Sequence, residues 1–104
     1  MYAVLGIWTV PGTRAERVES IETHVVPFVR TVHGFHDARY AFDTDSDRAY
    51  TYVAFDTEAD ARRFIDLVAT ERRPVQQAHG VQLDQEFVLL DILLEVAAEP
   101  AAAA

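Results

Sequence analysis

The sequence predicts an α+β sandwich, in which one antiparallel sheet of four strands carries two helices on the same face. Runs of aliphatic and aromatic residues, typical of strands, alternate with two segments whose apolar residues recur at helical spacing. The elements follow the order strand, helix, strand, strand, helix, strand, and no repeat at the period of a solenoid interrupts them. Two strand–helix–strand halves joined in this way predict a ferredoxin-like βαββαβ fold.

The first half opens with a strand. Residues 2–10 are almost entirely aliphatic or aromatic and stop at Pro11-Gly12, which is a strong turn signal. A helix begins next, because Thr13 stands three residues before Glu16, the spacing of a capping box. The apolar residues that follow recur at helical spacing as far as Val32.

Pro27 falls inside this helical pattern. Because proline lacks the backbone N–H of the helical hydrogen bond, we expect the helix to kink there or to end near Val26. Gly34 closes the helical region, and the second strand is expected over residues 33–42. The third strand, residues 48–55, follows a short polar loop, so these two strands form a hairpin.

The second half repeats the alternation. Asp56 or Thr57 caps the second helix, because an acidic residue follows Thr57 at capping distance. Residues 70–80 are polar and include both a proline and a glycine, so we expect one short helical turn there. Residues 81–96 are predicted to form the last and longest strand.

Length and composition limit the domain organisation and the classes of partner. A chain of 104 residues forms one domain, which we place at residues 1–96, with an alanine-rich tail over residues 97–104. The chain contains no cysteine, which excludes disulfides, thiolate metal sites and cysteine nucleophiles. The net charge of −8 repels phosphate backbones and anionic lipids, so we expect no nucleic-acid partner and no membrane partner.

Other features bear on location and source. No apolar run reaches the roughly 18 residues of a membrane-spanning helix, and the N-terminal residues lack the basic start of a signal peptide. We therefore expect a cytoplasmic protein. All nine basic residues are arginine, lysine and asparagine are absent, and alanine is abundant. Because codons for lysine and asparagine are rare in GC-rich genomes, we expect a high-GC bacterial source.

Both faces of the predicted sheet are apolar. In the last strand Phe87 and Leu89 point to one side while Val88 and Leu90 point to the other, and the first and third strands show the same pattern. Two helices cover one face only, and monomers rarely expose an apolar patch above a few hundred Å². We expect a second copy of the chain to cover the other face. The alternative is that bends and loops of the same chain cover it.

Several short stretches resemble those of a known family. Gly34-Phe35 opens the second strand, residues 53–61 lead from an aromatic strand end through an acidic residue to a helix cap, and Gly80-Val81 enters the last strand. With the element order, these stretches make residues 2–96 similar to the dimeric α/β-barrel superfamily, and within it to antibiotic-biosynthesis-monooxygenase-like domains. The resemblance implies a homodimer whose two sheets close a barrel. It also implies a small cavity in each subunit, between the sheet and its own helices.

The resemblance further implies an activity. The best-known enzymes of the family oxidise aromatic polyketides or quinols with dioxygen and without metal or flavin, so we expect no cofactor. Where those oxygenases have asparagine, tryptophan and tyrosine, this sequence has Thr51, Phe55 and Ala61. The haem-degrading relatives have a histidine before the last strand that His79 matches, whereas Phe64 stands near the position of their tryptophan.

Tyrosine and histidine are the bases that remain available for this chemistry. The candidate catalytic residues are His79 and Tyr52. Aromatic side chains from several elements suit a pocket for a planar ligand, and the expected lining residues are Trp8, Tyr40, Phe55 and Phe64. The alternatives are that His79 is a loop histidine and that the aromatic residues only pack in the core and the dimer interface.

Two patterns that resemble metal sites do not meet the requirements of one. Residues 43–47 carry aspartate at every second position, as the start of a calcium loop does, but Arg48 takes the place of the required glycine. His33 and His36 lie three residues apart in a turn that enters a strand, without the further ligands that a metal needs. We therefore expect no metal site.

Three functions remain at this point. The first is a cofactor-free monooxygenase that acts on an aromatic or quinone-like small molecule. The second is a non-catalytic homodimeric protein that binds a small apolar ligand, and the third is an interaction module without a cavity. A cavity with a buried histidine, tyrosine or arginine favours the enzyme, a purely apolar cavity favours the binding protein, and a filled core favours the module.

Overall fold

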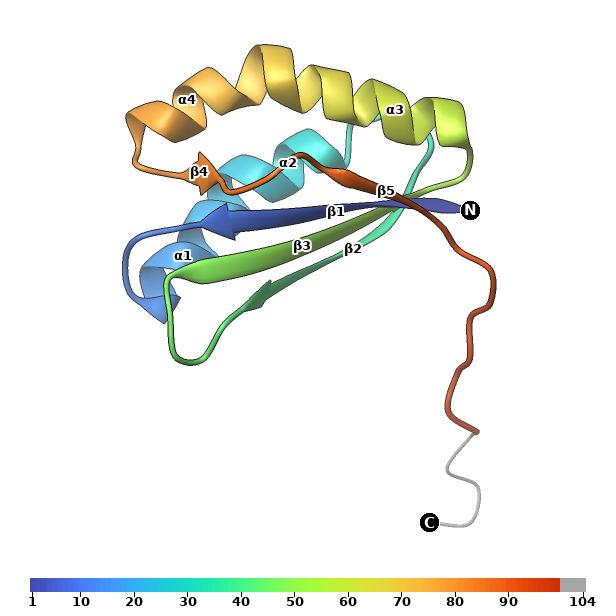
Figure 1. Cartoon of the computed structure of the whole chain (residues 1–104), viewed down its shortest axis with the longest axis horizontal. Coiled ribbons are helices and arrows are strands. Elements are labelled where there is room, and N and C mark those ends of the chain that lie inside the picture. Colours follow the sequence, from blue (N-terminus) through green and yellow to red (C-terminus); the bar gives the residue numbers. More distant parts are fainter. Residues whose placement is uncertain (100–104) are drawn as a thin grey trace.

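The computed structural model describes residues 1–99, so residues 100–104 of the predicted tail lie outside the described part. One antiparallel sheet forms a layer, and the helices lie together on one of its faces (Figure 1). The strand order is β2-β3-β1-β4, with β5 also paired to β1. This arrangement confirms the α+β ferredoxin-like fold that the sequence predicts.

Three strands agree closely with the sequence prediction. They are β1 (Tyr2–Thr9), β2 (Phe35–Phe42) and β3 (Arg48–Phe55). β3 has the predicted bounds, β1 is one residue shorter, and β2 begins two residues later. β3 lies between the other two, and its pairing with β1 sets Gly6 opposite Thr51.

The last strand differs from its prediction. A single strand over residues 81–96 is wrong, because the structure contains two short strands, β4 (Gln82–Leu83) and β5 (Val88–Asp91). Residues 92–99 form neither helix nor strand. The pairing of β5 with β1 reaches only to Tyr2, and the chain beyond it leaves the sheet.

A bulge separates β4 from β5. Trp8 of β1 pairs with β4, and Leu5 pairs with β5. Two residues of β1 therefore stand opposite residues 84–87, which is a local insertion of two residues in the last strand. The extra length allows Phe87 to turn its ring onto Trp8, with 5.6 Å between the ring centroids in an edge-to-face arrangement.

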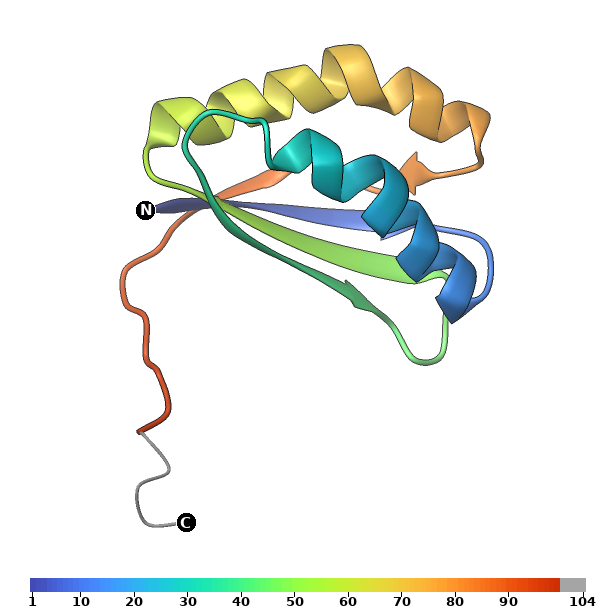
Figure 2. The same ribbon diagram turned by 180° about the vertical axis from the view of Figure 1, so that it is seen from behind.

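Each of the two helical segments contains a π-helical turn. Figure 2 shows both segments on the same side of the sheet. The first segment consists of α1 (Arg14–Ser20), η1 (Ile21–Val25) and α2 (Val26–Val29). The second consists of α3 (Glu58–Leu67), η2 (Val68–Arg72) and α4 (Arg73–Ala78). The capping box of Thr13 with Glu16 is confirmed, and Thr57 caps α3 through a bond from the Asp60 N–H to its hydroxyl oxygen.

Both π-helical turns precede a proline. Pro27 and Pro74 each stand two residues after the end of η1 or η2. A proline cannot donate a helical hydrogen bond, and the turn before it widens while the helix continues. The first helix does not end near Val26, which was one of its two expected outcomes, but continues through Pro27 to Val29. The prediction of a single helical turn within residues 70–80 is wrong, because helix extends without a break to Ala78.

The core lies between the sheet and the helices. Its largest fully buried side chains are those of Val4 and Phe55. Within residues 1–99, no helix lies on the opposite face of the sheet (Figures 1 and 2). Apolar side chains remain on that face, and Val88 and Leu90 are each 37% exposed.

The C-terminal residues extend away from the body of the molecule (Figure 1). We call residues 92–99 the C-terminal arm. Its large apolar side chains Leu93, Leu94 and Val96 are exposed by 79% or more.

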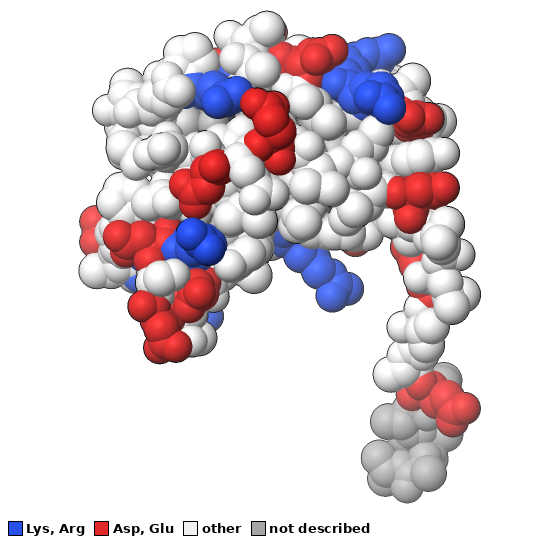
Figure 3. Space-filling model, in the orientation of Figure 1, with Lys and Arg blue, Asp and Glu red and all other residues white. Residues whose placement is uncertain are grey.

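Acidic residues dominate the charged surface. Figure 3 shows a group of them around the hairpin that joins β2 to β3, where residues 43–47 carry three aspartates. Within residues 1–99, no helix is both long and apolar enough to cross a lipid bilayer.

Candidate functional site

A cavity of about 360 Å³ lies between the sheet and the two helical segments. Its floor comes from β1, β2 and β3, and its walls come from both helical segments and from Phe87 of the bulge. This volume falls within the range of roughly 300–1,000 Å³ that is usual for small-molecule sites. The location agrees with the cavity that the family resemblance implies.

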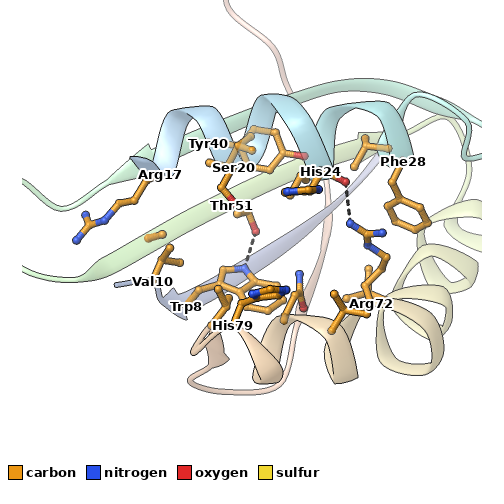
Figure 4. Close-up of a pocket in the computed structure, with 18 of the residues that line it drawn as sticks. Trp8, Val10, Arg17, Ser20, His24, Phe28, Tyr40, Thr51, Arg72 and His79 are labelled. Carbon is orange, nitrogen blue, oxygen red and sulfur yellow. Dashed lines mark hydrogen bonds between the residues drawn. The ribbon is translucent and has the colours of Figure 1, made fainter. Parts of the chain in front are cut away.

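The π-helical turns before the two prolines help to explain why a cavity forms there. Closely packed regular helices would fill the space above the sheet. The wider turns η1 and η2 both border the cavity and interrupt this packing. Arg72 of η2 connects the two segments, because its Nη2 donates to the backbone carbonyl of His24 over 2.7 Å (Figure 4). The Arg72 guanidinium also lies over the ring of Phe28, 4.9 Å from its centroid.

On the floor of the cavity, the indole Nε1 of Trp8 donates a hydrogen bond of 3.0 Å to the hydroxyl of Thr51 (Figure 4). The bond passes across Gly6, where an added Cβ would lie only 2.5 Å from Nε1 and 2.7 Å from the Thr51 oxygen. Residue 6 is therefore glycine because a larger side chain has no room there, and not because its backbone conformation needs glycine. The ring of Phe87 closes the same corner.

Tyr40 provides the buried phenol of the site. Its ring comes from β2 and lines the cavity, and its hydroxyl oxygen is buried without a hydrogen-bond partner in the described residues. Burial raises the pKa of Tyr40 to about 12. The phenol therefore stays protonated at neutral pH and acts as a hydrogen-bond donor rather than a base.

Basic side chains surround the cavity in a chain that is acidic overall. Two arginines and two histidines line it, against a single glutamate, Glu16. Hydrogen bonds from the Thr13 backbone and hydroxyl hold the pKa of Glu16 below its usual range, and the carboxylate belongs to the cap of α1. Arg17 is buried, contacts the ring of Phe42 and donates to Asp47 over 3.0 Å.

The structure brings four of the six predicted site residues to this cavity: Trp8, Tyr40, Phe64 and His79. Trp8 and Tyr40 come from the sheet, Phe64 comes from α3, and His79 follows the end of α4. His79 is exposed and its ring lies at the edge of the cavity (Figure 4).

The other two predicted residues are not in the cavity lining. Phe55 is fully buried in the core between β3 and α3, with its ring centroid 5.0 Å from that of Phe64. Tyr52 alternates with the inward-facing Thr51 and Val53, so its side chain lies on the opposite face of the sheet. Tyr52 therefore has no place in a site built on this cavity.

The polar lining residues that the sequence did not predict include Arg17, His24, Thr51 and Gln76. Three of them lie on the helical segments, and the π-helical turns change the side of the helix that His24 and Gln76 face. A signal existed for Thr51 alone, because strand alternation places it on the same face as Val53.

The acidic and histidine side chains do not converge as metal ligands would. Across residues 1–99, no group of three or more histidine, aspartate or glutamate side chains could hold a metal ion. His36 bonds its neighbour Asp37, and His33 bonds Asp60. Both pairs lie outside the cavity lining.

Comparison with known proteins gives fold similarity without sequence similarity. No family model and no curated protein matches the chain. Among solved structures, a proposed antibiotic biosynthesis monooxygenase from Deinococcus radiodurans superposes with a TM-score of 0.72, at 12% identity over 96% of this chain and 100% of that one. The fold is that of an antibiotic biosynthesis monooxygenase-like domain.

Two further structures have the same fold and are from Streptomyces. A variant of SnoaB, a cofactor-independent oxygenase from Streptomyces nogalater, has a TM-score of 0.64 and 19% identity over 93% of this chain and 97% of that one. The monooxygenase ActVA-Orf6 of Streptomyces coelicolor, in complex with nanaomycin D, has a TM-score of 0.59 and 22% identity over 95% and 91%. The resemblance stated from the sequence is thus confirmed for the fold.

Proposed function

We propose that this chain is a cofactor-independent monooxygenase that acts on an aromatic or quinone-like small molecule in the cavity. The observation that carries the proposal is one largely apolar cavity that combines a buried phenol, Tyr40, with a histidine, His79, at its mouth. The cavity argues against an interaction module with a filled core. The shared fold with SnoaB and ActVA-Orf6, which are described as oxygenases, supports the same function.

The proposed reaction needs only the substrate and dioxygen. An aromatic ketone with an acidic CH2 group loses one proton to a base and becomes a carbanion, which is also a phenolate by resonance. The carbanion transfers electrons to dioxygen, and a carbon–oxygen bond forms to give a hydroperoxide once the proton returns. Loss of water then leaves a new carbonyl, so one oxygen atom enters the product and the other leaves as water.

The residues of the cavity suit these steps. His79 stands where it can accept the proton at the mouth and release it to solvent. The protonated Tyr40 hydroxyl can donate to the developing phenolate oxygen, and such a donor is most effective in an apolar site. The rings of Trp8, Phe28 and Phe64 provide a surface for a planar substrate and exclude water from the carbanion.

Oxygen uptake with anthrone as the substrate tests the proposal. We expect dioxygen consumption equal to the anthraquinone formed, with one labelled atom in the product when labelled dioxygen is used. The variant His79→Ala should lower kcat by roughly 100-fold, because general-base catalysis contributes at least that factor. The control is Gln77→Ala, which changes an exposed residue of the preceding helix α4 that does not line the cavity.

The alternative is a binding protein of the same fold, and the predominantly apolar cavity wall is the observation that favours it. A binding protein would hold anthrone with micromolar affinity but leave its rate of oxidation at the value measured in buffer. Uptake that matches the buffer rate, or an unchanged kcat in His79→Ala, would therefore refute the oxygenase.

We also propose that two copies of the chain associate through the open face of the sheet. No helix of the described residues 1–99 covers this face. Its apolar surface comes from Leu5, Ile7, Tyr50, Val88 and Leu90. The C-terminal arm leaves the sheet on this side and carries three strongly exposed apolar side chains. A second copy would bury both the face and the arm, which a monomer leaves in water.

Mass measurement in solution tests the association. Light scattering should give twice the chain mass of 11.7 kDa. The variant Leu90→Arg should give monomer or aggregate, because a charge on the buried face has no partner. Val18→Arg is the matched control. The exposed fraction of Val18, 38%, is similar to that of Leu90, but Val18 lies on α1 rather than on the open face of the sheet. A wild-type mass near that of one chain would end this proposal.

A further inference from the structure

The buried polar atoms that lack a partner are gathered in one place. Among the described residues, three buried side-chain atoms have no hydrogen-bond partner: Arg17 Nε, Tyr40 Oη and Gln76 Oε1. All three residues line the same cavity. Folded proteins leave few buried polar atoms unpaired, because each one has lost its hydrogen bonds to water without a replacement. Their concentration in the cavity indicates that their partners come from outside the chain.

Tyr40 offers a donor. Its hydroxyl is held on β2 in the floor of the cavity, on the side of His24 (Figure 4). Because burial raises the pKa of Tyr40 to about 12, the O–H is present throughout the physiological range. A ligand oxygen without a hydrogen, such as a carbonyl or phenolate oxygen, would complete this bond.

Gln76 offers an acceptor from the opposite wall. It lies on α4, and its backbone carbonyl accepts from the N–H groups of His79 and Val81 over 3.0 and 2.9 Å. The backbone at this residue is therefore fixed while the side-chain oxygen is unpaired. A ligand hydroxyl would complete its bond. The third atom, Arg17 Nε, belongs to a guanidinium whose Nη2 is already bonded to Asp47.

We propose that Tyr40 and Gln76 recognise two different oxygen substituents of the ligand. Tyr40 donates a hydrogen bond to a carbonyl or phenolate oxygen, and Gln76 accepts one from a hydroxyl. The ligand class is then a planar aromatic that carries both a carbonyl and a hydroxyl group, such as a hydroxyquinone. This inference rests on the proposed function only in taking the ligand to be aromatic, and it requires no turnover.

Four bicyclic compounds of similar size separate the two contacts. Naphthalene carries no oxygen, naphthol carries a hydroxyl, naphthoquinone carries carbonyls, and hydroxynaphthoquinone carries both. Binding is measured by calorimetry and by quenching of Trp8, the only tryptophan. The chain contains neither cysteine nor lysine, so quinones meet few nucleophiles that could form covalent adducts.

The variants should lose affinity selectively. Tyr40→Phe should weaken naphthoquinone and hydroxynaphthoquinone roughly tenfold, as expected for one lost hydrogen bond, and leave naphthalene unchanged. Gln76→Leu should weaken naphthol and hydroxynaphthoquinone in the same way. Gln76→Met serves as a second variant of similar length, and Gln77→Leu serves as the exposed control. Thermal unfolding confirms that each variant is folded.

The outcomes distinguish this inference from the proposed function. If both variants leave all four affinities unchanged, water satisfies the two atoms and the inference is wrong. If they change all four affinities equally, neither residue recognises a particular oxygen, and the inference is wrong as well. If no compound binds to the wild type, it is also wrong. If the variants lose affinity selectively but the wild type does not oxidise anthrone, the oxygenase is refuted. The recognition of the ligand by Tyr40 and Gln76 then still holds.

Discussion

The Trp8 indole donates to the Thr51 hydroxyl over 3.0 Å across Gly6, and the missing side chain of this glycine leaves the space for the bond between β1 and β3. The bond orients the indole that forms part of the cavity floor. Thr51 lines the same cavity. Its hydroxyl can still donate to a ligand while it accepts from Trp8.

Replacing Thr51 should destabilise the protein through Trp8. The variant Thr51→Val removes the acceptor and leaves a buried indole N–H unpaired, at a cost of about 1–3 kcal/mol in the free energy of unfolding. In a Trp8→Phe background the same change should cost much less. Urea unfolding of the four proteins in this cycle measures the coupling. Equal costs in both backgrounds would show that the bond contributes nothing.

Adding a methyl group at residue 6 should also destabilise the protein. In Gly6→Ala the new Cβ overlaps Trp8 Nε1 and the Thr51 hydroxyl, and it lies 3.0 Å from the Phe87 ring. We expect a loss of roughly 1–3 kcal/mol, as for other overpacked sites. Combining it with Thr51→Ala should restore part of the loss, because one of the overlapping atoms is removed. Unfolding by urea and the Trp8 fluorescence maximum report both effects.

Stability at low pH should depend on Asp60. A bond from His33, over 2.9 Å, and another from the Thr57 hydroxyl hold the pKa of this carboxyl below its usual range. Its contribution to stability is therefore complete above the unfolded pKa, about 4, and is lost as the pH falls through the lower folded pKa.

The variant Asp60→Asn should accordingly show a shallower loss of unfolding free energy between about pH 5 and pH 2. The matched control is Asp66→Asn, which changes an exposed carboxylate of the same helix. Urea unfolding at a series of pH values gives both slopes. A variant slope as steep as that of the wild type would contradict the role of Asp60.

Removing the C-terminal arm should weaken the proposed dimer and leave the subunit folded. A chain that ends at Ile92 keeps every residue of the sheet and the cavity but loses the exposed apolar side chains of the arm. Sedimentation should show a higher dissociation constant and an unchanged thermal transition at high concentration. A chain that ends at Val96 removes only the alanine-rich tail and should behave as the wild type.

The local elements could be predicted because their signals are local. The bounds of β3 follow from an apolar run between a polar loop and a helix cap, and the caps at Thr13 and Thr57 follow from spacing. The bulge could not be predicted in this way. Residues 81–96 alternate well enough for a continuous strand, and the break depends on the pairing with β1, which is a tertiary contact.

The site was predicted in part for a related reason. Strand alternation alone places Tyr52 and Phe55 on opposite faces of the sheet, because they lie an odd number of residues apart along the strand. The sequence therefore contained the information that removes Tyr52 from the cavity. The helical lining residues were different, because α1 buries Arg17 and leaves Val18 38% exposed, against the expectation for an apolar stripe.

The two residues inserted opposite Gly6 and Ile7 also bear on how such a protein could change its ligand. Phe87 reaches the cavity because of backbone length, and residues 84–86, which supply that length, are exposed and do not line the cavity. Shortening this segment would withdraw a ring from the wall and enlarge the site while every other lining residue stays in place. Insertions and deletions at the sheet edge therefore give a route to new substrate sizes that leaves the chemistry of the floor intact.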